Sequence, residues 1–234
     1  MTRSRVLLAL FVLAAAGDLL SLAVGFDPGH TMAKPLLMPL LAAWAALRGA
    51  PRLLVAALLC GWGGDILLLL DADPAFLAGM ASFAAGHICY LTLFARTGRP
   101  RARGALLAPC YATALIATVA LLWPDLPADL RLPVAVYSTL LTAMAYSAAT
   151  RFGPVAGAGG VLFLLSDTLI ATGVAEWPQP PRPDLWIMLT YIAAQFLLAH
   201  GGTSRRDQGL PGRLTGGGGA DRPQGGGDQV AVIS

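Results

Sequence analysis

The chain has 234 residues, of which 56% are hydrophobic and 12% are charged, and its mean hydropathy is +0.65. Soluble domains carry roughly twice that share of charged residues, so the composition excludes an ordinary water-soluble domain. The net charge of +3 is too small an excess to predict binding to nucleic acid. The apolar residues fall in long runs separated by short segments rich in Arg, Pro and Asp. This pattern predicts an all-α, polytopic transmembrane helix bundle.

Eight apolar runs are candidate membrane spans. In chain order they cover residues 5–25, 29–47, 53–70, 76–95, 104–123, 132–149, 155–175 and 185–200. Each approaches the roughly 20 residues that a helix needs to cross about 30 Å of hydrocarbon. The second run spans only if it takes in Lys34, which would then be a cation inside the membrane. Arg3 and Arg5 resemble the start of a signal peptide, but the first run continues past Asp18 and is interpreted as a span.

The basic residues alternate between the two sides of these spans. One set of alternate loops holds 13 of the 16 Lys and Arg residues, and the other set holds only Lys34, Arg131 and Arg182. Basic loops stay in the cytoplasm, so the asymmetry predicts eight spans with both termini cytoplasmic. The abundance of Ala, Gly and Arg hints at a bacterial source, which would place the protein in a bacterial inner membrane.

The sequence divides into a membrane domain over residues 1–200 and a tail over residues 201–234. The tail is rich in Gly, Arg, Asp and Gln and cannot bury a core, so we predict a disordered cytoplasmic extension. Residues 83–87 resemble residues 191–195, which suggests that the first four and last four helices are parallel halves. Chance similarity between helices rich in Ala and Leu explains this resemblance equally well.

Five ionisable residues lie inside the predicted spans, on five different helices: Asp18, Lys34, Asp65, His87 and Asp167. An unpaired carboxylate at mid-membrane costs at least about 2.5 kcal/mol, so each must face the bundle interior and find a partner or a proton. At about 1.5 Å per residue, the three carboxyls and the histidine lie about 9 to 16 Å from the outer ends of their helices. We therefore predict one polar layer in the outer half of the bundle. Plain structural roles stay open, such as a snorkelling Lys34 or a structural His87.

Several known chemistries find no motif in this sequence. A Gly-x-Ser-x-Gly elbow, a His-Glu-x-x-His pair and a phosphate-binding loop are all missing from the spans. One buried histidine cannot build a His-rich zinc site, and the three cysteines match no metal or redox spacing, so we predict neither a metal nor a soluble cofactor. Two carboxyls with Lys and His in a lipid-accessible cavity suit acid–base chemistry on an amphiphile or ion-coupled transport.

Five short motifs, each on the expected helix, resemble the YhhN-type lysoplasmalogenase family of eight-span membrane proteins. They are Lys34-Pro35, Gly64-Asp65, Phe83-x-x-x-His87-x-x-Tyr90, Leu162-Phe163-x-x-Ser166-Asp167 and Tyr191-x-x-x-Gln195. The resemblance extends from the first to the eighth predicted helix and omits the tail. It implies a hydrolase that cleaves the vinyl ether bond of lysoplasmalogens, with a lysophospholipid as substrate and a fatty aldehyde as one product.

Enol ether hydrolysis needs an acid and a nearby anion, because protonation of carbon creates an oxocarbenium ion. We expect Asp65 and Asp167 to share these roles, and the sequence does not say which is the acid. His87 would orient a carboxylate or the water, and Lys34 would meet the phosphate or an Asp. The substrate-binding set is completed by Asp18, Tyr90, Tyr191 and Gln195. A proton-coupled transporter and a lipid-binding membrane protein remain alternatives that use the same groups.

Overall fold

The structure is a computed structural model, and it describes residues 2–70, 72–100 and 102–208. Over these residues the protein is all-helical, with eight α-helices and no strand, and each of the eight expected helices is present. The helices are α1 (Arg3–Val24), α2 (Asp27–Leu47), α3 (Arg52–Leu68), α4 (Asp73–Thr97), α5 (Ala108–Leu122), α6 (Ala128–Ser147), α7 (Pro154–Val174) and α8 (Pro183–Gln208). A short 3-10 helix, η1 (Ala102–Leu107), precedes α5, and a π-helical turn, η2 (Ala148–Phe152), follows α6.

Proline and glycine set many of the helix ends. A proline occupies one of the first two positions of α2, α4, α5 and α7, where its missing N–H has no helical partner to lose. Gly25 ends α1 at a φ of 74°, and Gly153 precedes α7 at a φ of 109°, conformations that a residue with a side chain rarely adopts. These residues account for the agreement between the expected and observed boundaries.

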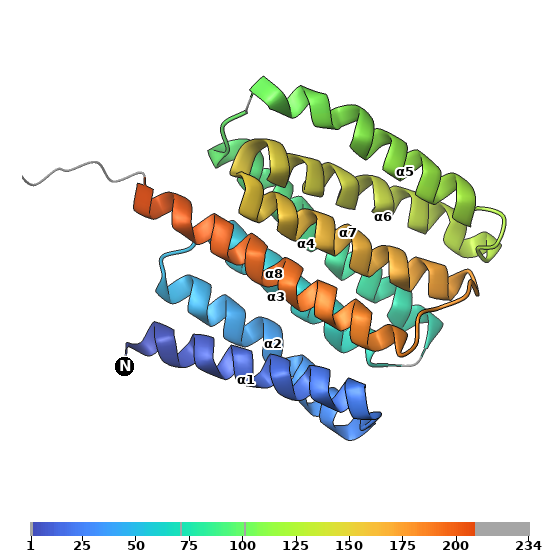
Figure 1. Cartoon of the computed structure of the whole chain (residues 1–234), viewed down its shortest axis with the longest axis horizontal. Helices are drawn as coiled ribbons and strands as arrows, with labels where there is room; N and C mark the ends of the chain where they lie inside the picture. Colours follow the sequence, from blue (N-terminus) through green and yellow to red (C-terminus); the bar gives the residue numbers. More distant parts are fainter. Residues whose placement is uncertain (1, 71, 101, 209–234) are drawn as a thin grey trace, which may run out of the picture.

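Apart from α4 and α5, helices that follow one another in the chain pack as antiparallel neighbours, and Figure 1 shows the resulting bundle. The most extensive contacts join α3 to α4, α7 to α8 and α1 to α2. Contacts of α4 with α6, and of α8 with α1 and α2, hold these pairs together. Helix α1 lies at one flank of the bundle and α5 at the other, and the start of α1 and the end of α8 are at the same end (Figure 1).

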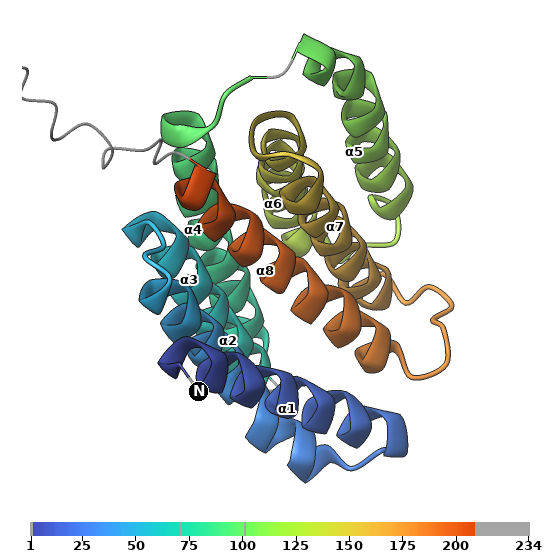
Figure 2. The same ribbon diagram turned by 60° about the vertical axis from the view of Figure 1, so that its left-hand side comes forward.

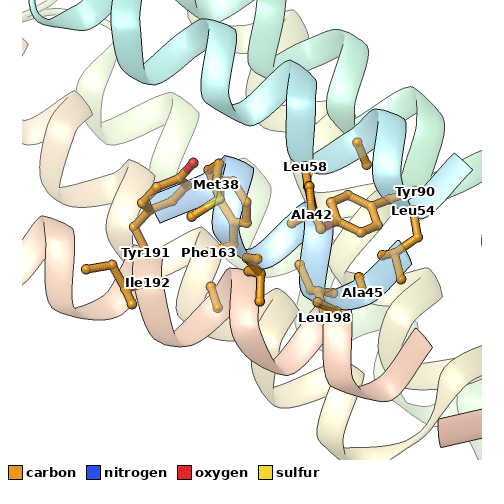
Figure 3. Packing of buried hydrophobic residues seen from close by; sticks show 14 of the residues in the cluster. Met38, Ala42, Ala45, Leu54, Leu58, Tyr90, Phe163, Tyr191, Ile192 and Leu198 are labelled. Carbon is orange, nitrogen blue, oxygen red and sulfur yellow. The ribbon is translucent and has the colours of Figure 1, made fainter. Parts of the chain in front are cut away.

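Small residues let the helices approach closely where the polar layer is built. A Cβ atom on Gly86 of α4 would lie 3.1 Å from the carbonyl oxygen of Ala57 in α3, and one on Gly159 of α7 would lie 2.9 Å from that of Ala194 in α8. Such contacts need glycine, because any side chain would push the two helices apart. The core beside these contacts is apolar. Figure 3 shows part of it, including Met38, Leu58 and Phe163.

Within the described part of the chain, six helical segments are long and apolar enough to cross a membrane: Arg3–Val24, Asp73–Thr97, Gly104–Leu122, Ala128–Phe152, Pro154–Val174 and Pro183–Thr203. The protein is therefore a multi-pass membrane protein. Helix α3 has only 17 residues, and α2, the span least favoured by its sequence, is also outside this set. Helix α8 continues to Gln208, eight residues past the expected end at His200, and residues 209–234 of the predicted tail lie outside the described residues.

Candidate active site

A cavity of about 200 Å³ opens between the helices in the half of the bundle where α3 and α7 end. Every helix except α1 contributes to its wall. Apolar side chains from α4, α5 and α6 form much of the surface, among them Phe76, Met80, Leu115 and Val134. The ionisable side chains that line the cavity, here called its polar wall, are Lys34, Asp65, Tyr137, Asp167 and Tyr191. The cavity is therefore amphiphilic, because ionisable and apolar side chains both line it.

Asp65 is the first of two carboxyls on the polar wall and is only 2% exposed. The Tyr191 hydroxyl of α8 donates a hydrogen bond of 2.8 Å to its Oδ2 atom. Behind Tyr191, the Gln195 amide donates to the same hydroxyl at 3.4 Å, and the Tyr90 hydroxyl donates to Gln195 Oε1 at 2.8 Å. Because all these side chains are buried, the chain of hydrogen bonds fixes the Asp65 carboxyl against the wall.

The i, i+4 spacing of Tyr191 and Gln195 places both on the face of α8 that meets α3. Gly61, one turn before Asp65, makes room for them. A Cβ atom there would lie 2.9 Å from Gln195 Nε2 and 3.2 Å from the Tyr191 hydroxyl. The sequence thus combines a small residue on α3 with two polar residues on α8 to bring a tyrosine to the carboxyl.

Asp167 of α7 is the second carboxyl, and it is more open to the cavity than Asp65. The Tyr137 hydroxyl of α6 donates a hydrogen bond to Asp167 Oδ2. His87 Nε2 lies 3.1 Å from the same hydroxyl, so the histidine meets the carboxyl only through the tyrosine. The ring of His87 packs edge-on against Phe163, with 4.9 Å between centroids, and its Nδ1 atom is buried without a hydrogen-bond partner among the described residues. His87 does not itself line the cavity.

Sequence reasoning missed Tyr137. Its position in α6 was a usable signal. Tyr137 lies nine residues after the start of α6, which at about 1.5 Å per residue is a depth of about 14 Å from that end of the helix. This depth is within the range expected for the carboxyls. A tyrosine at that depth is a common structural hydrogen-bonder, so its depth alone did not distinguish it. The pairing with Asp167 depends on the rotation of α6 about its axis, which the sequence does not give.

Lys34 reaches the cavity from α2 and is 9% exposed. Among the described residues it has no hydrogen-bond or ion-pair partner, although its charge lies within electrostatic range of Asp65. Pro39 cannot supply the N–H that would normally bond the Pro35 carbonyl one turn earlier. The indole of Trp62 in α3 donates to that carbonyl instead, at 2.9 Å. This contact ties the turn of α2 that carries Lys34 to the helix that carries Asp65.

Asp18 does not join the cavity wall. It is fully buried, and its Oδ1 atom pairs with Nδ1 of His30 at 2.8 Å, while its Oδ2 atom has no hydrogen-bond partner among the described residues. Of the eight residues expected at the site, Lys34, Asp65, Asp167 and Tyr191 therefore line the cavity directly. His87, Tyr90 and Gln195 are buried and do not line the cavity. No three His, Cys, Asp or Glu side chains of the described residues group closely enough to hold a metal ion.

Comparison with known protein families identifies the family to which the chain belongs. The model of the YhhN family matches residues 29–202, which contain every residue of the cavity wall. The chain belongs to the YhhN family. No solved structure matches it.

Curated YhhN-family relatives carry the name lysoplasmalogenase. The pig protein Lysoplasmalogenase TMEM86B is 41% identical over 146 residues, which cover 62% of this chain and 61% of the relative. The human protein of the same name is 38% identical over 64% of this chain and 63% of its own length. The Lysoplasmalogenase of Mycobacterium tuberculosis is 34% identical over 191 residues, covering 74% of this chain and 71% of the relative. This YhhN-family chain thus matches a little over three fifths of the length of the two mammalian relatives.

Proposed function

We propose that this protein is a lysoplasmalogenase-like ether hydrolase embedded in the membrane. It would cleave the vinyl ether bond of a lysoplasmalogen with water and release a fatty aldehyde and the glycerophospho head group. Two carboxyls and a lysine on the wall of one amphiphilic cavity carry the proposal, because they match the chemistry that the relatives' name denotes. Neither a cofactor nor a metal is required for this reaction.

The division of the cavity matches the shape of such a substrate. The apolar wall of α4, α5 and α6 would hold the alkenyl chain, and Lys34 would meet the phosphate. Helix α5 packs on α6 and more lightly on α7, and over the described residues it does not pack against α4. Figures 1 and 2 both place it at the edge of the bundle. A lipid chain would therefore reach the cavity sideways from the bilayer, beside α5.

The reaction needs the two carboxyls in different protonation states. Proton transfer to the β-carbon of the vinyl ether creates an oxocarbenium ion, water captures it as a hemiacetal, and the hemiacetal collapses to aldehyde and alcohol. A protonated carboxyl supplies the first step, and an ionised one stabilises the cation, as in glycosidases. Asp65 and Asp167 are proposed as this pair. Both present one oxygen to a tyrosine and face the same cavity.

The proposed setting is a bacterial inner membrane crossed eight times, with both termini and residues 201–234 in the cytoplasm. The charge asymmetry of the loops supports this orientation. The start of α1 and the end of α8 lie at the same end of the bundle, as an even number of membrane crossings requires (Figure 1). Helix α3 would cover about 26 Å at 1.5 Å per residue, enough for a span beside a polar cavity.

The decisive experiment is aldehyde release by purified protein in detergent, with a lysoplasmalogen as substrate and an ester lysophospholipid as control. We expect aldehyde from the first lipid and none from the second. Asp65→Asn and Asp167→Asn should each lower kcat by about 10²-fold or more, since general acid catalysis contributes about that much. Asp129→Asn, an exposed carboxyl in the first turn of α6, is the matched control and should keep full activity.

Folding of the variants would be checked by thermal unfolding and size-exclusion profiles. Near-normal turnover by both aspartate variants would contradict the carboxylate mechanism. Binding of the lysolipid without aldehyde release would indicate a lipid-binding protein instead. Proton-driven flux across liposomes without hydrolysis would indicate a transporter.

A further inference from the structure

The two carboxyls of the cavity are held in the same way but stand in different surroundings. Each accepts a tyrosine O–H on its Oδ2 atom, from Tyr191 at Asp65 and from Tyr137 at Asp167. The Oδ1 atom of each has no hydrogen-bond partner among the described residues and is not sealed from the cavity. A proton on either carboxyl is therefore directed to Oδ1, because Oδ2 already faces a donor.

Charge distinguishes the two carboxyls. Lys34 lines the cavity with both, and its positive charge acts on Asp65. A neighbouring cation favours the ionised form of a carboxyl. Asp167 has only the Tyr137 hydroxyl as a polar partner among the described residues. Among the described residues, Asp65 therefore has a countercharge for its ionised form, and Asp167 has none.

Access to the cavity points the same way. Asp65 is 2% exposed, whereas Asp167 is partly exposed on the cavity wall. An anion that stabilises a cation can act across a short gap, but an acid that protonates carbon must touch it. The more accessible carboxyl is the one that suits direct contact with the substrate.

The partners behind Tyr137 set the direction of its hydrogen bond. If His87 carries its proton on Nε2, it donates to Tyr137, and Tyr137 is then committed to donate to Asp167. The other tautomer would place an N–H on Nδ1, which is buried without a partner, and buried N–H groups without partners are rare and costly. The apolar pocket of His87 thus selects the tautomer that keeps Asp167 Oδ2 an acceptor.

We propose that Asp167 is the general acid and Asp65 the stabilising anion, and that Tyr137, oriented by His87, holds Asp167 so that its proton sits on the oxygen facing the substrate. This assignment rests on the proposed hydrolase function. Tyr137 and His87 are positioning residues, since they act through Asp167.

The proton balance of the cycle follows. The Asp167 Oδ1 proton forms a C–H bond with the β-carbon, using the π electrons of the vinyl group, while a lone pair of the ether oxygen completes the oxocarbenium ion. Water adds to the α-carbon and returns a proton to the Asp167 carboxylate, giving a hemiacetal. The bond from the α-carbon to the glycerol oxygen then breaks, and the hemiacetal hydroxyl proton passes to that oxygen. Asp65 remains ionised throughout.

Stereochemistry tests the assignment. In D₂O a fixed acid delivers deuterium to one face of the vinyl group, so the wild-type aldehyde should carry a single configuration at C2. The aldehyde would be reduced as it forms, to prevent exchange, and the alcohol analysed by NMR as a chiral ester. Asp167→Asn should lower kcat by about 10²-fold or more and give residual product of mixed configuration. Asp65→Asn should lose comparable activity but keep a single configuration.

Tyr137→Phe and Tyr191→Phe form a matched pair that keeps enough activity for analysis. Tyr137→Phe should lower kcat about tenfold with KM unchanged, because the carboxyl can rotate and its proton then shifts between the two oxygens; this loss equals about 1.4 kcal/mol. The acid stays on the same side of the vinyl group, so the product should keep a single configuration. Tyr191→Phe should keep the single configuration. Mixed product from the Asp65 variant or from either tyrosine variant, a single configuration from the Asp167 variant, or wild-type kcat in Tyr137→Phe would overturn the assignment alone. Absence of aldehyde from the wild-type protein would overturn the proposed function as well.

Discussion

At the scale of single residues, the site depends on side chains that are small as much as on those that are charged. Gly61 carries no functional group, yet the hydrogen bonds from Gln195 to Tyr191 and from Tyr191 to Asp65 pass beside its Cα atom. Tyr137 of α6 and Tyr191 of α8 each donate a hydrogen bond to one of the two carboxyls. Each carboxyl therefore depends on a neighbouring tyrosine, and only one of the two, Tyr191, belongs to a motif that the sequence analysis identified.

Substituting Gly61 tests this dependence. In Gly61→Ala the new methyl group would lie 2.9 Å from Gln195 Nε2 and 3.2 Å from the Tyr191 hydroxyl, so both side chains must move away from Asp65. We expect kcat for aldehyde release to fall about tenfold, equal to about 1.4 kcal/mol, while the protein stays folded. Gly173→Ala in α7, where a Cβ atom meets nothing within 4 Å, is the control and should keep wild-type kcat. Equal activity of the two variants would contradict the role given to this contact.

At the scale of the helices, the sequence specified where each one begins and ends better than how each is turned. Apolar runs and bounding prolines predicted eight helices, and counting residues predicted a shared depth for Lys34, Asp65 and Asp167, which line one cavity. Rotation about the helix axis was not predictable, because in lipid an apolar residue on either face satisfies the pattern. The sequence therefore did not show that Asp18 pairs with His30 and does not line the cavity.

Dependence on tertiary packing also explains the remaining differences between the predictions and the structure. Tyr137 sits at the expected depth, but its link to Asp167 depends on the packing of α6 on α7. The extension of α8 to Gln208 had no sequence signal, since Gly201 and Gly202 read as the start of a tail. These glycines instead face Ala156 and Leu54, so tertiary packing keeps the helix going.

The contact between α2 and α3 gives a prediction at the scale of these helices. Trp62 donates to the Pro35 carbonyl because Pro39 cannot. Trp62→Phe should lower the free energy of unfolding by about 1 kcal/mol, the typical value of one hydrogen bond. In a Pro39→Ala background the new N–H can bond the carbonyl, so Trp62→Phe should then cost much less. Denaturation of all four proteins in detergent measures the coupling, and an equal cost of Trp62→Phe in both backgrounds would contradict it.

At the scale of the whole molecule, seven α-helices line the cavity, and α5 is the one of these that lies at the flank of the bundle. Thr118 of α5 lines the apolar part of the wall, whereas Ile116, two residues earlier, is 66% exposed on the outer surface. If the alkenyl chain lies along this wall, a larger side chain at position 118 must displace part of it. Each methylene group excluded from an apolar site costs about 0.8 kcal/mol, so two would lower kcat/KM about 15-fold.

Thr118→Phe should therefore lower kcat/KM for a long-chain lysoplasmalogen by about tenfold or more, and should leave a short-chain substrate nearly unaffected, because the short chain ends before this wall. Ile116→Phe places the same aromatic side chain on the same helix, on the side that faces away from the cavity, and it should change neither value. The measurement is aldehyde release as a function of chain length for both variants and the wild-type protein. Equal loss for long and short chains would mean that position 118 affects folding or the polar wall rather than chain binding. Equal effects of the two substitutions would show that the chain does not lie along α5.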